Sequence, residues 1–257
     1  MANYIVGMSN MGYHSQSGIS SSAVKSVYKK TLAHWKGEKR TQTAAFTMGS
    51  AVHALLLEED RNLVKKGPKT KASAAFKAQK EELNEDEVLL TEVEYNVANR
   101  IAKGALDNPS CKSLLRHKER VNEVSIFQKD PISGLLLKTR PDLMILSEQT
   151  VYDVKTTQDA SPRGFQNECF KYSYHIQAAF YVYVCQLAGL DIKEFGFIAC
   201  EKTSPFISHL HIVGPDLLEI ATEQLHRTLG VIAEAEEQAE FGTGWGEYSI
   251  LERPKWL

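Results

Sequence analysis

Two aspartates and a lysine lie close together in this sequence, with a spacing that could hold a metal ion. Asp142 precedes Asp153 by eleven residues, and Lys155 follows in the tripeptide Asp-Val-Lys. β-Branched and aliphatic residues around them predict two strands, residues 135–146 and 150–156, with a turn in the polar segment between them. Antiparallel pairing about that turn sets Asp142 opposite Asp153, with their side chains roughly 5 Å apart.

Two bare carboxylates at that distance repel each other unless a cation lies between them. Mg²⁺ or Mn²⁺ suits such a site, because hard cations prefer oxygen ligands. Lys155 is two residues beyond Asp153 and points to the same face, where its ammonium could orient or activate a water. These groups would support metal-assisted phosphodiester hydrolysis. An Asp-x-Lys on a solvated strand face is the alternative, and this pattern alone leaves both open.

Two further residues could complete the metal shell. His53 lies in the apolar helical stretch MGSAVHALLLE, where it is either a core histidine with one hydrogen bond or a ligand facing the two aspartates. Glu123, in VNEVSIF, is expected near Arg140 and Asp142 through strand pairing. It is then either a surface partner of Arg140 or an outer ligand for a second metal ion.

Gln177 is the polar exception in the apolar run YHIQAAFYVY. It shares one helix face with Tyr181, four residues further on. A glutamine on the sheet-facing side of a helix needs hydrogen-bond partners. We expect a water nucleophile, a DNA phosphate or Lys155 to supply them, while the tyrosines pack as core.

Composition excludes several classes of protein. The chain has 257 residues, 43% hydrophobic and 24% charged, which is ordinary globular usage. It has no apolar run of membrane-spanning length and no signal-peptide pattern at its start. The four cysteines are scattered without zinc-site or redox spacing. We therefore expect a cytoplasmic protein with reduced thiols, no membrane association and no iron–sulfur cluster.

Charge is divided unevenly along the chain. Residues 1–80 carry 13 Lys and Arg against 4 Asp and Glu, whereas the remainder carries 17 against 28. The basic excess clusters in residues 25–40 and 65–80. A basic first part is consistent with contact to a phosphate backbone. For residues 65–80, a solvated lysine-rich helix surface explains the pattern equally well.

Periodicity predicts a helical first half and a sheet-centred second half. The expected helices are residues 20–35, 46–59, 72–83, 87–103, 109–117, 162–188 and 215–241. The expected strands are residues 121–128, 135–146, 150–156, 194–201 and 206–213, of which the first three form a meander with KDPISG as its first turn. We expect one α/β domain over residues 1–257, a central mixed sheet flanked by helices. Residues 1–118 would form a mainly helical channel wall, and residues 119–257 the catalytic core.

An ordered set of motifs resembles a known superfamily. GISSSAVKSVYKK, MGSAVHALLLE, NEVSIF, RPDLMI, DVKTT and YHIQAAFYVY occur in this order. Together they resemble the RecB-like branch of the PD-(D/E)xK nucleases, and within it the RecE-type exodeoxyribonuclease VIII domain, a relative of lambda exonuclease. The resemblance runs nearly end to end, including the closing GEYSILERPKWL.

The resemblance assigns roles to the residues that match its motifs. It implies His53, Asp142 and Asp153 as metal ligands with the carbonyl of Val154, and Glu123 as the acid serving a second metal ion. It also implies Lys155 as the catalytic lysine and Gln177 as the motif glutamine. The pattern Ile-Ser-x-Ser resembles the region that meets the 5′ end of DNA. The expected DNA contacts are Ser20, Ser22, Lys25, Arg140 and Tyr181.

The function implied by this resemblance is Mg²⁺-dependent digestion of linear double-stranded DNA from 5′ to 3′, with Mn²⁺ as a substitute ion. The product would be 3′ single strands for recombination, passed to a single-strand annealing recombinase. A homo-oligomeric ring of three or four chains is expected around the DNA. Two alternatives remain: another repair nuclease or endonuclease of the same branch, and a nuclease-fold DNA-binding subunit without catalysis.

Overall fold

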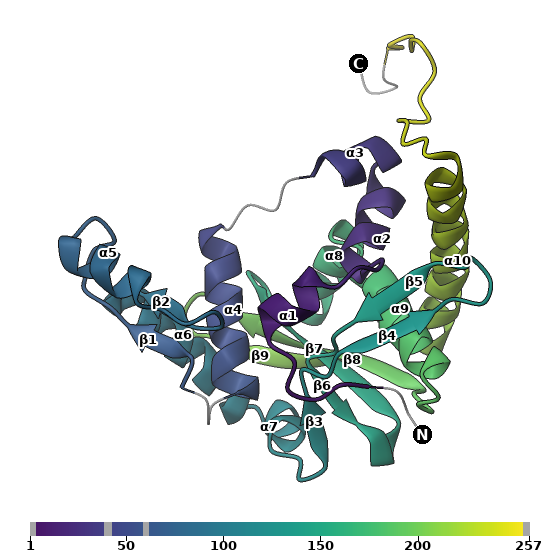
Figure 1. The fold of residues 1–257 in the computed structure, drawn as a ribbon. Helices are drawn as coiled ribbons and strands as arrows, with labels where there is room; N and C mark the ends of the chain where they lie inside the picture. The colour runs from purple at the N-terminus through teal and green to yellow at the C-terminus, as the bar shows by residue number, and fades with distance from the viewer. Residues whose placement is uncertain (1–3, 39–42, 59–61, 254–257) are drawn as a thin grey trace.

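The centre of the molecule is a five-stranded mixed β-sheet with the strand order β3-β6-β7-β8-β9 (Figure 1). The computed structural model describes residues 4–38, 43–58 and 62–253. The sheet strands are β3 (Arg120–Asn122), β6 (Leu143–Ile145), β7 (Thr150–Thr157), β8 (Glu194–Glu201) and β9 (Ser208–Ile212). β7 and β8 run parallel, and the other neighbouring pairs are antiparallel. A parallel pair needs a long crossover connection, which α8 (Pro162–Lys171) and α9 (Tyr174–Leu187) supply.

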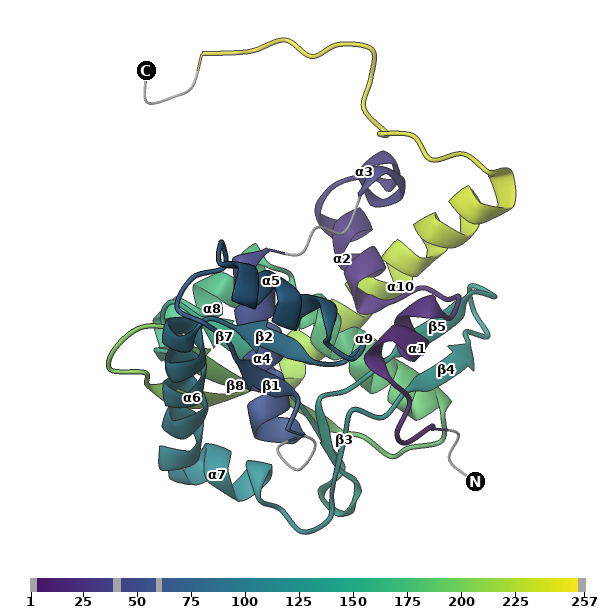
Figure 2. The ribbon, with the colours of Figure 1, turned by 60° about the vertical axis from the view of Figure 1, so that its left-hand side comes forward.

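Helices cover both faces of this sheet (Figures 1 and 2). The helices are α1 (Asn10–Ser15), α2 (Ser21–Lys29), α3 (Leu32–Gly37), α4 (Ala44–Leu57), α5 (Ala74–Glu81), α6 (Glu92–Asp107), α7 (Pro109–Leu115), α8 (Pro162–Lys171), α9 (Tyr174–Leu187) and α10 (Pro215–Gln238). α2, α9 and α10 pack together on one face, and α4, α6 and α7 on the other. This arrangement confirms the predicted α/β architecture. Among the described helices, none is long and apolar enough to cross a membrane.

The alternation of side chains along β7 creates two hydrophobic cores. Val151 belongs to the core under α9 and α10, whereas Tyr152 and Val154 belong to the core under α4 and α6. Successive side chains of a strand point to opposite faces, so Asp153 and Lys155 share the face of Val151. The candidate catalytic groups of β7 therefore face α9 and α2.

Two helices predicted as continuous are each divided in two. The predicted helix over residues 20–35 is interrupted at Thr31, which is extended and caps α3 by accepting a hydrogen bond from the backbone N–H of His34. The predicted helix over residues 162–188 is interrupted at Ser173, whose φ of 55° is left-handed. The apolar periodicity continues across both breaks, which explains why the sequence pattern did not reveal them.

The predicted helix over residues 87–103 was wrong at its start. Residues 88–90 form β2 (Val88–Leu90), which pairs in parallel with β1 (Val64–Lys66), a strand that the sequence pattern did not predict. α6 begins only after Thr91, whose side chain forms a reciprocal capping box with Glu94. Three apolar residues in a row fit a strand as well as a helix, so periodicity could not distinguish them.

The predicted three-stranded meander was also wrong in part. β4 (Ile126–Lys129) and β5 (Leu136–Thr139) form a separate antiparallel hairpin, while β3 and β6 belong to the central sheet. Glu123 separates β3 from β4 with a φ of 51°. The turn at KDPISG is confirmed, and Asp130 stabilises it by accepting hydrogen bonds from the backbone N–H groups of Ile132 and Ser133.

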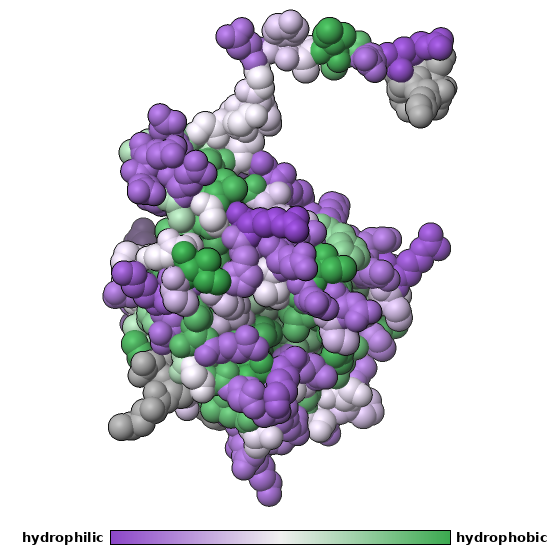
Figure 3. Space-filling model, turned by 90° about the vertical axis from the view of Figure 1, so that its right-hand side faces the viewer, coloured by the Kyte–Doolittle hydropathy of each residue, from purple (hydrophilic) through white to green (hydrophobic). Residues whose placement is uncertain are grey.

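The remaining elements lie close to their predicted positions. β8 and β9 form the expected hairpin, and α10 begins at Pro215 but ends at Gln238, before the predicted residue 241. α4 begins two residues before the predicted residue 46, and the predicted end at residue 59 lies outside the described residues. Residues 243–253 form no helix or strand and extend away from the body (Figures 1 and 3).

A short N-terminal segment crosses the front of the molecule. It contains α1, which the sequence pattern did not predict, and it is attached at both ends by β-bridges, Ile5 with Ser125 and Ile19 with Leu137. The buried ammonium of Lys138 donates to the backbone carbonyls of Tyr13 and Gln16 at the end of α1. α1 is thereby held beside the pocket that Asp153 and Lys155 line.

Candidate active site

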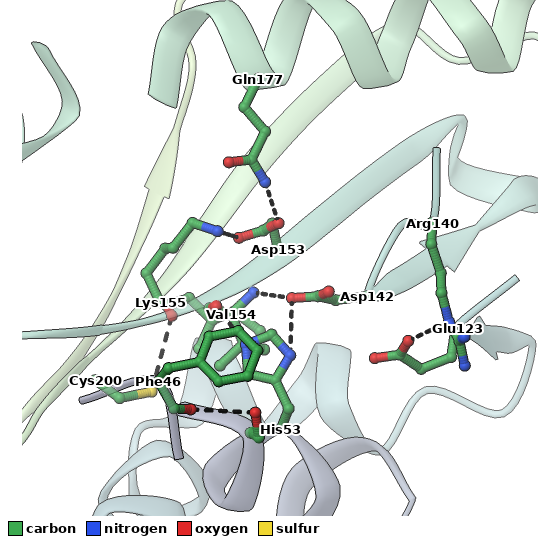
Figure 4. Close-up of polar contacts among 12 residues, drawn as sticks. Phe46, His53, Glu123, Arg140, Asp142, Asp153, Val154, Lys155, Gln177 and Cys200 are labelled. Carbon is green, nitrogen blue, oxygen red and sulfur yellow. Dashed lines mark hydrogen bonds and ion pairs between the residues drawn. The ribbon is translucent and has the colours of Figure 1, made fainter. Parts of the chain in front are cut away.

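The β6–β7 hairpin brings the two aspartates together as the sequence predicts. Leu143 pairs with Tyr152, so Asp142 and Asp153 occupy the next paired position of the same register. Both side chains are buried. Asp142 accepts a hydrogen bond of 2.7 Å from the backbone N–H of Val154 through its Oδ2 atom (Figure 4).

His53 reaches the hairpin from α4, on the opposite side of the sheet. Its Nε2 lies 2.8 Å from the carbonyl oxygen of Val154, and its Nδ1 lies 3.5 Å from Oδ2 of Asp142. A tautomer that carries its proton on Nε2 donates to this carbonyl and leaves the lone pair of Nδ1 toward Asp142. Two of the groups that the resemblance assigns to the metal with His53, the carbonyl of Val154 and the carboxylate of Asp142, are therefore its direct neighbours.

Glu123 completes a group of three ligand side chains. Its left-handed backbone turns it back toward β6, where its N–H donates to the carbonyl of Asp142 at 3.2 Å. One ligand atom from each of His53, Glu123 and Asp142 lies within 4.8 Å of the others. Arg140 contacts Glu123 at 2.6 Å, so the expected ion pair also exists. The pairing with Arg140 and a role as a ligand are compatible, because the carboxylate has two oxygens.

The electrostatics of these acids favour a bound cation. Burial and, next, the charge of Asp153 raise the pKa of Asp142 well above its usual value. Burial and, next, the charge of Asp142 raise the pKa of Glu123 to about 7. A buried carboxylate with a raised pKa keeps its proton in the absence of metal. A divalent cation that takes the place of this proton stabilises the carboxylate strongly. One imidazole, two carboxylates and a nearby carbonyl fit Mg²⁺ or Mn²⁺ as a donor set.

Asp153 lies beside this group and faces a different set of partners. Its Oδ2 contacts the ammonium of Lys155 at 2.5 Å, and its Oδ1 accepts a 2.5 Å hydrogen bond from the side-chain amide of Gln177. The carbonyl of Gln177 accepts in turn from Lys25 at 2.8 Å. Within the protein Gln177 thus bonds to Asp153 and Lys25, and not to Lys155, which was one of the three partners considered from the sequence.

The two lysines of this chain of contacts differ in charge behaviour. Burial alone would lower the pKa of Lys155, but the carboxylates of Asp153 and Asp142 outweigh it and raise the pKa above its usual value. Burial and, next, the charge of Lys155 lower the pKa of Lys25 to about 7. Lys155 therefore stays protonated near neutral pH, whereas Lys25 is close to its titration point.

One pocket of about 520 Å³ contains all of these groups. The five residues expected to contact DNA also line it: Ser20, Ser22, Lys25, Arg140 and Tyr181. The sequence interpretation missed further lining residues, among them Tyr174, Tyr13 and the acidic residues 85–87. Tyr174 precedes Gln177 by one helical turn, a spacing that could have identified it. The acidic segment gave no such signal, because only the folded chain brings it to the pocket.

Comparison with known proteins supports this picture at the level of the fold. A crystal structure of a candidate exonuclease from Eubacterium rectale aligns over 97% of this chain and 96% of its own, with a TM-score of 0.67 and 15% sequence identity. The crystal structure of SSO0001 aligns over 70% of this chain and 84% of its own at 11% identity, with a TM-score of 0.31. No curated protein matches the chain.

The family comparison covers most of the sequence, including every residue that the sequence predicts for the site. The model of the PDDEXK-like domain of unknown function (DUF3799) matches residues 20–251. The central mixed sheet, the Asp142 to Lys155 hairpin and the flanking helices are arranged as this nuclease-type fold requires. The chain therefore belongs to the DUF3799 family of PDDEXK-like domains.

Proposed function

We propose that this protein is a Mg²⁺-dependent exodeoxyribonuclease that digests linear double-stranded DNA from 5′ to 3′. The observation that carries the proposal is the meeting of His53, Glu123 and Asp142 with the Asp153–Lys155 pair in one pocket. Membership of a PDDEXK-like family supports nuclease activity in general. The RecE-type order of the motifs supports the double-stranded substrate and the polarity.

The metal ligands, Lys155 and Gln177 have different roles in the proposed reaction. A Mg²⁺ ion held by His53, Glu123 and Asp142 would supply Lewis-acid stabilisation of the charge that develops on the phosphate. The ammonium of Lys155 donates a hydrogen bond to the attacking water or to a phosphate oxygen, because its raised pKa keeps it protonated. Gln177 holds Asp153 from the other side and so fixes the position of this pair.

The same proposal includes how the protein holds DNA, what happens to the product strand and which ion can replace Mg²⁺. The residues 1–118 form one wall of the DNA channel, and the 3′ strands left by digestion pass to a single-strand annealing recombinase. The basic excess of residues 1–80 suits a surface that holds a phosphate backbone. Mn²⁺ would replace Mg²⁺, since both ions accept mixed oxygen and imidazole ligands.

One assay tests the activity and the polarity together. A linear duplex labelled at either its 5′ or its 3′ ends, and a closed circular duplex, are incubated with the protein in Mg²⁺ or in EDTA. We expect early release of the 5′ label only, no cleavage of circles and no cleavage in EDTA. Nicking of the circle would instead indicate an endonuclease. A folded, DNA-binding protein that cleaves neither substrate in Mg²⁺ or Mn²⁺ would be a non-catalytic subunit.

A pair of acid variants connects the activity to the site. Asp142→Asn removes a buried charge from the ligand group, so we expect activity to fall at least roughly 1000-fold, equivalent to several kcal/mol of transition-state stabilisation. Asp191→Asn changes an exposed acid outside the pocket and should leave activity unchanged. Near-normal activity of Asp142→Asn in Mg²⁺ would show that the site is wrongly assigned.

A further inference from the structure

Aromatic rings and lysine amines alternate along a path that leads out of the pocket. Tyr174 lines the pocket, and the amines of Lys155 and Lys25 lie 5.1 Å and 5.4 Å from the centre of its ring. The ring of Tyr172 follows at 5.6 Å from that of Tyr174, with an angle of 33° between their planes. The amine of Lys29 lies 5.9 Å from the centre of the Tyr172 ring. We name Tyr172 and Tyr174 the tyrosine track.

The outer end of the tyrosine track is open to solvent. Tyr172 is 43% exposed and the neighbouring Phe170 is 49% exposed. Both lie at the end of α8, where the left-handed Ser173 separates α8 from α9 and keeps the segment out of the core. The amine of Lys171 lies 5.3 Å from the Tyr172 ring on this surface. Two exposed aromatic rings with lysines beside them form a surface that suits single-stranded nucleic acid, whose bases are planar and whose phosphates are negatively charged.

Such a surface discriminates between paired and unpaired DNA. Aromatic side chains bind single strands by stacking on bases, and lysines beside them contact the phosphates. In a duplex the base faces are already stacked, so they are not available to a tyrosine. The ring spacing of 5.6 Å is too short to admit a base between the two tyrosines, which requires roughly 7 Å, twice the rise between nucleotides. Within the tyrosine track, a base can therefore stack only on Tyr172, the exposed member of the pair.

We propose that the tyrosine track binds unpaired bases of the DNA strand that enters the site, by stacking on Tyr172, with Lys29 and Lys171 on the flanking phosphates. This proposal rests on the proposed nuclease function, because it assigns the strand that leads to Lys155. It adds that the substrate strand is separated from its complement next to the site. Substrates with unpaired nucleotides at the end should accordingly bind better than blunt duplexes.

Binding in EDTA tests the stacking without cleavage. The probes are a fluorescein-labelled single-stranded DNA 15-mer and a matched chain in which every internal nucleotide is abasic, and binding is followed by fluorescence anisotropy. We expect Tyr172→Ala to weaken binding of the normal 15-mer about tenfold. The abasic chain, which offers phosphates but no bases, should bind the variant and the wild type equally. Tyr172→Trp should keep the affinity, because the larger ring still stacks.

Matched variants separate stacking on Tyr172 from the general effect of removing an exposed ring. Tyr248→Ala removes an exposed tyrosine of the C-terminal tail and should bind both probes like the wild type. Phe170→Ala should weaken the normal probe less than Tyr172→Ala, because its ring lies beside that of His175 and is not part of the tyrosine track. Circular dichroism confirms that each variant is folded, as expected for exposed positions.

The result that would overturn the stacking is specific to this proposal. Equal binding of the normal 15-mer by Tyr172→Ala and the wild type, or an equal loss on both probes, would show that the rings do not contact bases. A wild type that does not bind the single strand at all would also overturn it. A protein that binds as expected but cleaves no DNA in Mg²⁺ would instead contradict the proposed function and leave the stacking supported.

Discussion

The ammonium of Lys155 touches the carboxylate of Asp153 and lies against the ring of Tyr174. We predict that Lys155→Ala lowers kcat at least roughly 100-fold, since one positioned donor contributes about this much to proton-transfer chemistry. DNA affinity should change far less, because a single lysine would supply only a small part of the contacts to the phosphates. Single-turnover cleavage in Mg²⁺ and binding in EDTA measure the two effects separately.

The conservative variant of the same residue sharpens this prediction. Lys155→Arg keeps the charge but replaces a point-like ammonium with a planar guanidinium, so it should bind DNA like the wild type without restoring kcat. If turnover and affinity fell by the same factor in Lys155→Ala, the lysine would be a phosphate contact and not a catalytic group.

Glu123 and Lys25 predict opposite dependences of stability on pH in the absence of metal. Glu123 has its pKa raised to about 7, so its contribution to stability is present below its unfolded value near 4.5 and is lost as pH rises through 7. Lys25 has its pKa lowered to about 7, so its contribution is present above its unfolded value near 10.5 and is lost as pH falls to 7. The contribution of Glu123 is therefore lost as pH rises to about 7, and that of Lys25 is lost as pH falls to about 7.

Urea unfolding in EDTA at pH 5, 7 and 9 measures these contributions as differences between variants. Relative to the wild type, Glu123→Gln should be less stable at pH 5 than at pH 7, by roughly 1–3 kcal/mol. Relative to the wild type, Lys25→Met should be more stable at pH 7 than at pH 9, by a similar amount. A constant difference across this range for either variant would contradict the perturbed pKa of that residue.

At the scale of elements, one glycine decides how closely the β8–β9 hairpin packs against α6. A Cβ atom at Gly104 would lie 2.0 Å from the backbone oxygen of Phe206, whereas a Cβ atom at Gly230 of α10 meets nothing within 4 Å. We predict that Gly104→Ala destabilises the protein by about 1–3 kcal/mol, because backbone has to move. Gly230→Ala should stabilise it by about 0.5–1 kcal/mol, because alanine loses less entropy in a helix.

Urea unfolding of the two alanine variants forms an internal comparison, since both substitutions are made within helices. Thermal unfolding should give the same order of stability. Two variants of equal stability would mean that the hairpin yields to the new methyl group without cost.

The elements that the sequence predicted correctly are those whose signals are local. The hairpin of Asp142 and Asp153 follows from strand alternation and a polar turn, and the start of α10 follows from Pro215. β1 and β2 could not be predicted, because each has only three residues and depends on a parallel partner about 24 positions away. The breaks at Thr31 and Ser173 occur within apolar periodicity and are set by packing of the helices around them.

The candidate site shows the same division between local and long-range information. Asp153 and Lys155 lie together as their spacing predicted, and His53 and Glu123 lie beside Asp142 as expected. The partners of Gln177 were not, because its bond to Lys25 joins residues 152 positions apart. Asp142 faces the imidazole of His53, and Asp153 faces the ammonium of Lys155. Tertiary packing decides this division, and the spacing in the sequence does not reveal it.

At the scale of the whole molecule, we predict a cyclic homo-oligomer of three or four chains. The chain is divided into a basic first part and an acidic remainder, which favours a head-to-tail contact between copies. A closed ring keeps DNA captive between cleavage events without tight binding at any one site. Light scattering at micromolar protein, with and without duplex, measures the mass. A monomeric mass in both conditions would be incompatible with a ring.

Salt dependence of processivity gives a second measure of the ring. A monomer holds DNA only by phosphate contacts, so the number of nucleotides removed per binding event should fall steeply with salt. A topologically closed ring should lose much less. The comparison between low and moderate salt, about 50 and 200 mM, on one long duplex separates the two assemblies.

The parallel pairing of β7 with β8 also determines when the site can form during synthesis. β7 ends at Thr157 and β8 begins at Glu194, so the ribosome must add the whole α8–α9 crossover before β7 gains its second neighbour. At about 10 residues per second this takes roughly 4 s. During that interval the nascent chain carries Asp142, Asp153 and Lys155 on a strand with one open edge and without Gln177 in place. The candidate site therefore cannot be complete before most of the sheet exists, and chains stalled before residue 194 should be cleaved rapidly by proteases.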